Sequence, residues 1–466
     1  MVIQDAFGSP DVRQIDGLGG ADILTSKVAI VSKRDNNTKT GTSKDNNETQ
    51  EDGIVADIDY LFGQVEFGKT SSSGESGTNT YSVPTSGVLY DVNCGNISAG
   101  VGPFAIEEGL MEVTDDTVTP IEMPTNSDGD SQGQKFCQKV RIHNVNTGKI
   151  IVAEVPVQKF FTNDHQDDAT TKSSYWEVVE DGDYEIDGVP GTSACIPIDF
   201  SKCTGTLGES NHGNENEVVN KRQELLSILP SGNPKDTVIV DECAYDVSLL
   251  DVANFVVHID GRQLGLTGKE DSKEILNDVE FWNTVRKIRY EAAKLVLEED
   301  EITLTRPFTS VVFPYLCDEG YESIRGDVIS DEEGTNQEDH ASIDFRAFVL
   351  FCDHPHKAYP GTASNATAAA ALIEGTVVND VMNRPIETTV GNGNTRCKEK
   401  VVTIGHPSGR MSVSSRIEER SSGVDDTDPI SDLKLLRSVI GRTSRRLADG
   451  RLYLKAHTVR RLNSER

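Results

Sequence analysis

A lone cysteine stands where the sequence predicts the start of a helix. The segment Asn93-Cys94-Gly95-Asn96 runs into a stretch rich in small residues, and we expect a helix over Asn96–Met111. A helix N-terminus presents unpaired N–H groups and a partial positive charge, so it binds carboxylates and stabilises a thiolate. This combination is suited to proton transfer on an anionic substrate.

A second helix of small residues is predicted over Thr362–Ile373, in the second half of the chain. It contains an alanine run and follows Pro360-Gly361. Two such helices, each opened by a glycine-containing turn and set among strands, predict two similar halves in which a sheet wraps a central helix. If both N-termini face a shared cleft, two helix dipoles act on one anion, which favours a di- or tricarboxylate substrate.

The elements around these helices are mostly strands. A third, amphipathic helix is predicted over Ser272–Glu299. Runs rich in β-branched residues between turn signals predict strands at Val28–Val31, Gln64–Phe67, Gly87–Val92, Val140–His143, Lys149–Pro156, Thr237–Val240, Phe255–Ile259, Phe345–Phe351 and Lys400–Ile404. Four polar stretches, at 34–53, 204–221, 329–340 and 421–429, are predicted to be loops without a chemical role.

Length and charge narrow the class of protein. A chain of 466 residues predicts two or three domains, and its net charge of −31 argues against nucleic-acid binding. Residues 433–466 are an exception, with ten Lys and Arg against two acidic residues. This segment is either a patch that attracts polyanions or a solvated segment that pairs with the acidic body.

Targeting signals and cysteine usage favour a reducing compartment. We find no apolar run of the length that spans a membrane, about 18 residues or more, and no secretory signal. The eight cysteines are dispersed and none has C-x-x-C spacing, so we expect no disulfide framework. We expect a cytoplasmic protein, with a mitochondrial location left open. The sequence is compatible with a homodimer and leaves the oligomeric state open.

Several sequence blocks resemble the PrpF family, a group of cofactor-independent isomerases of aconitate-like acids. The resemblance covers about 8–454, between the polar insertions. The blocks that carry it, in order, are Ile15–Asp22, Leu24–Val31, Cys94-Gly95-Asn96, Ile142–Gly148, Gly188–Thr192, His356-Lys357-Ala358 and Ile404–Gly409.

The resemblance implies a fold and a catalytic pair. The fold is the α+β, diaminopimelate epimerase-like architecture, with two pseudo-symmetric halves that each curl a sheet around a central helix. We expect the first half at 1–184 with a return segment at 430–466, and the second half at 185–420. The implied acid/base pair is the lysine of the Thr-Ser-Lys motif and the cysteine of the Cys-Gly-Asn motif, which here are Lys27 and Cys94.

The chain departs from the family pattern in two places. Diaminopimelate epimerases carry a second cysteine at the second helix, where this chain has Pro360-Gly361-Thr362; Cys352 lies upstream in a predicted strand. Family members also begin with a further segment that carries an Arg-Gly-Gly-Thr-Ser-Lys-Gly-like motif, whereas this sequence begins at Met1-Val2-Ile3. We expect either a truncated start or an incomplete site.

The chemistry sets the roles of the remaining candidates. Removing a proton next to an allylic carboxylate needs a positioned base and donors for the dienolate that forms. We favour Cys94 as base and Lys27 as acid, and reversing the reaction exchanges these roles. His356 and Lys357 are left open between carboxylate contact and surface. The expected substrate-binding residues are Thr25, Ser26, Gly95, Asn96, Gly191, Thr192, Gly361, Thr362, His406, Ser408 and Gly409.

These residues predict an isomerase that shifts or re-orients the C=C bond of an aconitate-type acid. A keto–enol tautomerase of the 4-oxalomesaconate type and a non-catalytic carboxylate-binding relative are the alternatives. We expect no cofactor and no metal, because His354-Pro355-His356 offers two ligands without an acidic cluster nearby. The only partner expected is a small di- or tricarboxylate.

Overall fold

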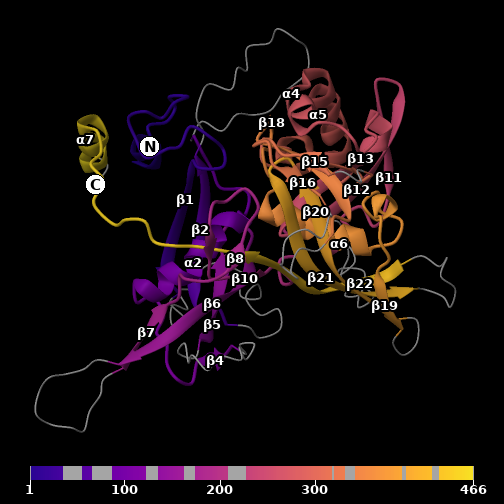
Figure 1. Ribbon diagram of the computed structural model, residues 1–466. Helices are drawn as coiled ribbons and strands as arrows, with labels where there is room; N and C mark the ends of the chain where they lie inside the picture. The colour runs from indigo at the N-terminus through magenta and orange to yellow at the C-terminus, as the bar shows by residue number, and fades with distance from the viewer. Residues whose placement is uncertain are drawn as a thin grey trace, which may run out of the picture.

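The structure is a computed structural model that describes ten stretches of the chain. They are residues 2–34, 55–65, 87–121, 135–161, 174–207, 227–316, 320–330, 342–390, 395–421 and 430–464. The strands form one large mixed sheet, with two small two-stranded sheets beside it. Figure 1 shows this sheet curling around two helices, α2 (Gly95–Glu107) and α6 (Gly361–Leu372). Most of each predicted insertion lies outside the described residues. The parts that are not described are 35–53, 208–221, 331–340 and 422–429.

The strands around α2 come from the first part of the chain. β1 (Lys27–Lys33) pairs antiparallel with β2 (Ile58–Val65), and β2 pairs parallel with β5 (Phe136–Asn144). The remaining strands here are β3 (Val88–Leu89), β4 (Val118–Pro120), β6 (Lys149–Phe161), β7 (Ser174–Val178), β8 (Tyr184–Glu185) and β9 (Thr192–Ser193). A short helix, α1 (Val2–Phe7), precedes them.

The strands around α6 follow. They are β11 (Asp236–Val240), β12 (Cys243–Val252), β13 (Asn254–Asp260), β14 (Phe308–Pro314), β17 (Phe345–Phe351), β18 (His354–Pro355), β19 (Glu387–Val390), β20 (Thr395–His406), β21 (Gly409–Ser421) and β22 (Ile430–Arg442). β15 (Tyr321–Glu322) and β16 (Val328–Ile329) form a separate pair. Short 3-10 turns lie at Gly261–Leu264, Glu299–Glu301 and Asn379–Val381.

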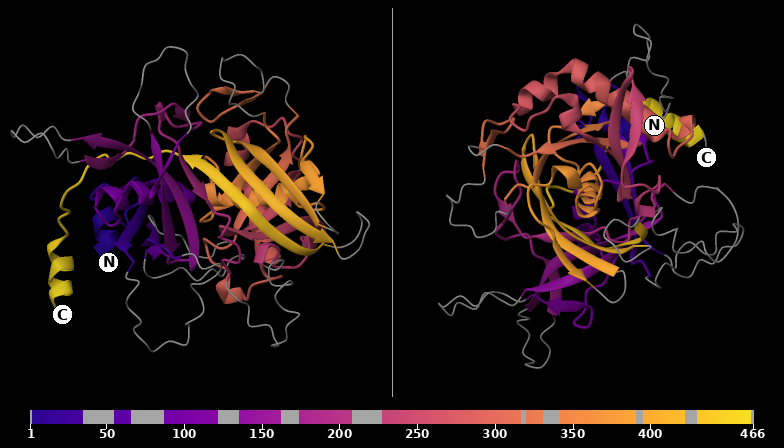
Figure 2. Two further views of the ribbon diagram at one scale, coloured as in Figure 1. Left: turned by 90° about the horizontal axis from the view of Figure 1, so that it is seen from below. Right: turned by 90° about the vertical axis from the view of Figure 1, so that its right-hand side faces the viewer.

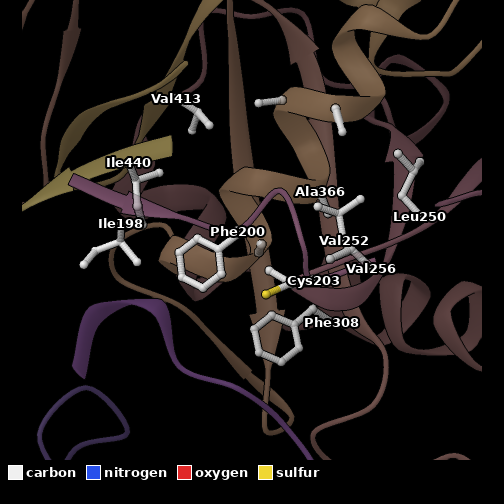
Figure 3. Packing of buried hydrophobic residues seen from close by; sticks show 14 of the residues in the cluster. Ile198, Phe200, Cys203, Leu250, Val252, Val256, Phe308, Ala366, Val413 and Ile440 are labelled. Carbon is white, nitrogen blue, oxygen red and sulfur yellow. The ribbon is translucent and has the colours of Figure 1, made fainter. Parts of the chain in front are cut away.

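Helix α6 is buried along its whole length. Its small residues let strands approach from every side, which Figure 2 shows in the right-hand view. A helix that is apolar all round belongs inside a protein, whereas an outer helix has one apolar face. Figure 3 shows side chains of β12, β13, β14, β21 and β22 gathered around Ala366, together with Phe200 and Cys203 from the chain after β10 (Ile196–Asp199).

Among the described residues, strand β10 connects the two curled regions. β10 pairs antiparallel with β6 on one side and with the end of β22 on the other. Side chains around both α2 and α6 belong to one continuous apolar cluster. The two curled regions therefore share a core, and the boundary predicted at 184/185 stays a prediction.

The predicted helices are found, with one difference. The segment predicted as one helix over Ser272–Glu299 forms α4 (Ser272–Asn277) and α5 (Val279–Ala293). Asp278 separates them because its backbone is extended and its carboxylate accepts a hydrogen bond from Phe281 N, which caps α5. α5 packs Trp282, Val285 and Ile288 on the outer face of the sheet. All nine predicted strands overlap observed ones, although 66–67 lie outside the described residues.

The basic C-terminal segment returns to the acidic first half. After β22 the chain crosses toward the N-terminus and ends in α7 (Ala456–Ser464), as Figure 1 shows. Arg446 forms an ion pair with Glu108 at 2.6 Å, and Lys455 pairs with Asp16 at 3.0 Å. These contacts agree with the interpretation that the segment pairs with the acidic body. In the part of the chain that the structure describes, no helix has the length and apolar character needed to cross a membrane.

Candidate active site

The two residues predicted as an acid/base pair are in contact. Cys94 is the N-cap of α2, and its side chain makes no capping hydrogen bond, so its thiol does not bind the helix amides. Lys27 is the first residue of β1, and its amine donates to Cys94 Sγ at an N–S distance of 3.5 Å. Cys94 is buried and Lys27 half-buried. The strand and the helix thus bring an amine and a thiol together from 67 residues apart.

The backbone around Cys94 is held on both sides. Asn93 Oδ1 accepts a hydrogen bond from Cys94 N at 2.8 Å, and Ser98 Oγ donates to Cys94 O at 2.7 Å. Asn144, the last residue of β5, donates to the same Asn93 oxygen at 3.2 Å. These bonds fix the turn that leads into α2, so the thiol has a defined position.

Asn254 joins the starts of the two central helices. Its Oδ1 accepts from Asn93 N at 3.0 Å, and its Nδ2 donates to Asn93 O at 2.8 Å and to Thr362 Oγ1 at 2.7 Å. The side chain is buried at the start of β13. Sequence reasoning missed this residue, and the available signal was a single polar side chain between Ala253 and Phe255 in an otherwise apolar run.

The N-termini of α2 and α6 meet at two glycines. A Cβ atom on Gly95 would lie 2.9 Å from Thr362 N, and one on Gly361 would lie 3.0 Å from Asn96 Oδ1. The first distance is to a main-chain atom and is too short for a side chain, so position 95 needs glycine, whereas a side chain at position 361 would require the Asn96 side chain to shift. The N-cap of α6, Pro360, also makes no side-chain capping bond. Two uncapped helix starts therefore place their partial positive charges side by side.

A buried arginine lies against both helix starts. Arg442, the last residue of β22, donates from Nε to Asn96 Oδ1 at 3.1 Å. Its Nη1 donates to Gly441 O at 2.7 Å, and its Nη2 lies 3.1 Å from Met411 Sδ. Burial lowers the pKa of this guanidinium from its ordinary value. In the sequence, Arg442 is one of the ten basic residues of 433–466, and no local pattern indicates its place here.

Two buried histidines complete the cluster in the neutral form. Burial, with the nearby His356 and Arg442, lowers the pKa of His406 to about 3. Burial, followed by the charge of Lys27, lowers the pKa of His356 to about 4. Ser408 N donates to His406 Nδ1 at 3.2 Å, so the neutral ring carries its proton on Nε2. His356, left open by the sequence, is buried, whereas Lys357 pairs with Asp22 at 2.8 Å.

Other predicted binding residues are engaged elsewhere. Ser26 Oγ donates to Gln14 at 2.6 Å, Thr25 is exposed, and Ser408 Oγ donates to the Lys357 carbonyl. Gly409 has a φ of +144°, and a Cβ there would meet Asp187 at 2.4 Å, so this glycine shapes its turn. For Gly191 and Thr192, both exposed, no contact in the described residues reaches Cys94. The binding roles of these residues stay predictions.

Of the remaining cysteines, Cys195 lies near Arg442, and Cys352 lies in a turn. Cys352 adopts a φ of +49° in the turn between β17 and β18. The seven cysteines of the described segments are free of disulfides, and Cys317 is outside them. No group of three or more His, Cys, Asp or Glu side chains in the described residues could hold a metal ion.

The sequence and the fold both have known relatives. Residues 1–455 match the PrpF family, described as PrpF protein. The chain is 31% identical to the 3-methylitaconate isomerase of Eubacterium barkeri over 458 residues, which covers 97% of this chain and 89% of that protein. It is 30% identical to the (4E)-oxalomesaconate Delta-isomerase of Novosphingobium sp. (strain KA1), covering 97% of this chain and 90% of that one.

A solved structure shows the same architecture. The crystal structure of a methylitaconate-delta-isomerase aligns with a TM-score of 0.58 and 30% identity, covering 98% of this chain and 88% of that one. This similarity supports a mixed α/β fold built on a large mixed sheet. Because the family match extends over nearly the whole sequence, through Lys27, Cys94 and Arg442, the chain belongs to the PrpF family.

Proposed function

We propose that this protein is a cofactor-independent isomerase that shifts or re-orients the C=C bond of an aconitate-type di- or tricarboxylic acid. The observation that carries the proposal is the 3.5 Å distance between Lys27 Nζ and Cys94 Sγ at the start of α2. The names of the relatives support the substrate class, since both act on unsaturated carboxylic acids. The proposal also assigns the diaminopimelate epimerase-like arrangement of two pseudo-symmetric halves, divided at 184/185.

The reaction needs a base, an acid and donors for a transient negative charge. Removing a proton from the carbon beside an allylic carboxylate gives a dienolate, and the double bond moves when a proton returns to another carbon. The two carbons that exchange the proton are separated by only one other carbon. A thiol and an amine in contact can therefore serve both positions without a large movement of the substrate.

We assign the base to Cys94 and the acid to Lys27 in one direction. The Cys94 thiolate takes the proton, and the Lys27 ammonium returns one to the other carbon. In the reverse direction the roles exchange, because each group ends a turnover in the protonation state that the reverse step needs. The main-chain N–H groups at the starts of α2 and α6 supply donors for the developing dienolate, since neither N-cap side chain occupies them.

A second substrate type is supported by one comparison. The 34% identity over 298 residues to the 4-oxalomesaconate tautomerase of Pseudomonas putida, which covers 64% of this chain and 56% of that one, favours a keto–enol tautomerisation of 4-oxalomesaconate as the alternative reaction. This reaction moves a proton between the carbon next to the ketone and the enol oxygen, so the same acid/base pair would serve it. The two reactions differ in their substrate, so a proton-exchange assay that includes 4-oxalomesaconate distinguishes them.

Proton-exchange NMR in deuterated water tests the function. The wild-type protein is incubated separately with 3-methylitaconate, 2-methylaconitate, cis-aconitate and 4-oxalomesaconate. We expect exchange with at least one of them, and a fall of about 10³-fold or more in Cys94→Ser and Lys27→Ala. Lys33→Ala, at an exposed position of the same strand, and Cys243→Ser, at an exposed position of β12, are matched controls that keep the wild-type rate.

The outcomes separate the function from the residue assignment. If the wild-type protein exchanges no proton with any of the four acids, the isomerase proposal fails and a non-catalytic carboxylate-binding protein remains. If exchange persists at the wild-type rate in both Cys94→Ser and Lys27→Ala, the isomerase survives but the pair is wrong.

A further inference from the structure

Arg442 is a buried cation without an anionic partner in the described residues. Only 7% of its surface is exposed, and its acceptors are an amide oxygen, a main-chain carbonyl and a thioether sulfur. Burying a charge without an opposite charge is costly, and proteins keep such a group mainly where a ligand or partner completes it. Within the described residues, the contacts of Arg442 are therefore incomplete.

The titratable neighbours of Arg442 do not supply the missing charge. Tyr184 and Cys195 lie within electrostatic reach of the guanidinium. Burial raises the pKa of Cys195 to about 11 and raises the pKa of Tyr184, so both remain neutral near pH 7. His406 is neutral as well, because its pKa lies at about 3. Cys94 is also within reach among the described residues, but the thiolate proposed there is paired with Lys27.

The guanidinium faces the place where both helix starts meet. A Cβ on Gly361 would lie 3.1 Å from Arg442 Nη2, which puts this edge of the guanidinium against the first residue of α6. The Nε atom contacts Asn96 in the first turn of α2. An arginine has five N–H donors, and the contacts to Asn96, Gly441 and Met411 use three of them. Two N–H groups remain, the number that a carboxylate accepts from an arginine.

We infer that Arg442 binds one carboxylate of the substrate, while Lys27 and Cys94 act on the carbon beside a second one. This inference rests on the proposed function, because it names the group that selects di- and tricarboxylates for that site. Two cations, Lys27 and Arg442, then face two carboxylates, with the starts of α2 and α6 between them. An acid with one carboxylate, held beside Lys27 and Cys94, would leave Arg442 without an anion, which explains the preference for di- and tricarboxylates.

Calorimetric titration with tricarballylate, a saturated tricarboxylate that has no double bond to move, tests this binding role. We expect the Kd to rise at least tenfold in Arg442→Met, because a charge-assisted pair is lost while the volume is largely kept. Arg442→Lys keeps the charge but loses the planar fork, and its Kd is expected to rise about fivefold. Arg446→Gln is the matched control, since Arg446 pairs with Glu107 and Glu108, and its Kd stays within twofold of wild type.

Chemical rescue distinguishes a binding role from a structural one. We expect guanidinium ions at low millimolar concentration to restore tricarballylate binding in Arg442→Ala and to leave Arg446→Gln unchanged. Circular dichroism checks that each variant is folded. A wild-type Kd in folded Arg442→Met overturns the inference, and so does a wild-type protein that does not bind tricarballylate. If Arg442→Met does not fold, a folded Arg442→Lys variant with the wild-type Kd is the overturning result.

The titrations and the proton-exchange assay together separate this inference from the proposed function. Arg442-dependent binding without any proton exchange in the wild type would refute the isomerase and keep the carboxylate site. Proton exchange with binding that does not depend on Arg442 would refute the carboxylate site and keep the isomerase.

Discussion

Replacing Gly95 by alanine adds one methyl group between the two helix starts. The backbone of Gly95 does not require glycine, because it is the first residue of α2 and has no positive φ. The added Cβ would lie 2.9 Å from Thr362 N and 3.0 Å from the carbonyl carbon of Gly361, both main-chain atoms. Main-chain atoms inside a packed core cannot rotate away, so the two helix starts must move apart.

The required movement sets the size of the effect. Ordinary contacts of a Cβ begin at 3.4 Å, so the helix starts must separate by roughly half an ångström. A misplacement of about 1 Å at a reacting centre costs about 100-fold in rate, and half of it corresponds to about tenfold, or about 1.4 kcal/mol. Overpacking of this kind also lowers the free energy of unfolding by about 1–3 kcal/mol. We expect both losses in Gly95→Ala.

Gly100→Ala is the matched control on the same helix. A Cβ at Gly100 would meet only the Ser444 hydroxyl, at 3.3 Å, and that side chain can rotate. Glycine within a helix is less favourable than alanine by about 0.5–1 kcal/mol, so this variant keeps or gains stability. Its rate of proton exchange stays within about twofold of wild type. The reasoning is refuted if folded Gly95→Ala keeps the wild-type rate, or if Gly100→Ala loses as much activity.

Two further predictions concern stability. Asn254→Ala removes three hydrogen bonds to Asn93 and Thr362 and leaves buried polar groups unpaired, so urea denaturation should show a free energy of unfolding lower by roughly 2–4 kcal/mol. An unchanged midpoint and slope would show that the Asn254 hydrogen bonds do not stabilise the junction of the two helix starts. Burial lowers the pKa of His258 from 6.5 to about 3, so the neutral ring stabilises the fold above pH 6.5 and this contribution is lost as the pH falls toward 3. In His258→Gln the pH dependence of the free energy of unfolding between pH 6.5 and 4 should weaken by about 1.4 kcal/mol per pH unit, and an unaltered dependence would refute the assignment.

Local patterns were sufficient to predict the helices that carry the candidate site. The alanine run before Leu372 predicts a helix with small residues on every side, and such a helix is stable only inside a sheet. The other helix was predicted to start after Cys94-Gly95, and in the structure Cys94 is the N-cap of α2. The contact between Lys27 and Cys94 follows from the family resemblance, since no periodicity in the sequence relates the two positions.

The roles of Arg442 and Asn254 depend on tertiary contacts, which the sequence does not show. Arg442 is the last residue of β22, which ends at the junction of the two curled regions, whereas its neighbours in sequence suggested an exposed basic segment. Asn254 acts through hydrogen bonds to residues more than 100 positions away. The strands β21 and β22 were not predicted because both are long and rich in polar residues, and their length comes from pairing with each other and with β20. No local sequence pattern identifies these distant residues and pairing strands.

A protein with a net charge of −31 can still hold a small anion at this site. At physiological ionic strength the Debye length is about 8 Å, so exposed carboxylates farther away are largely screened. The nearby Asp22 is already paired with Lys357. What the anion meets is the local arrangement of Lys27, Arg442 and two helix starts, in a buried region where screening is weak. The net charge argues against an extended polyanion, which would contact the acidic surface, but it leaves a compact dicarboxylate unaffected once that molecule is inside. For such a ligand, the positions of two cations decide binding, and the sum of all charges affects mainly how fast it arrives.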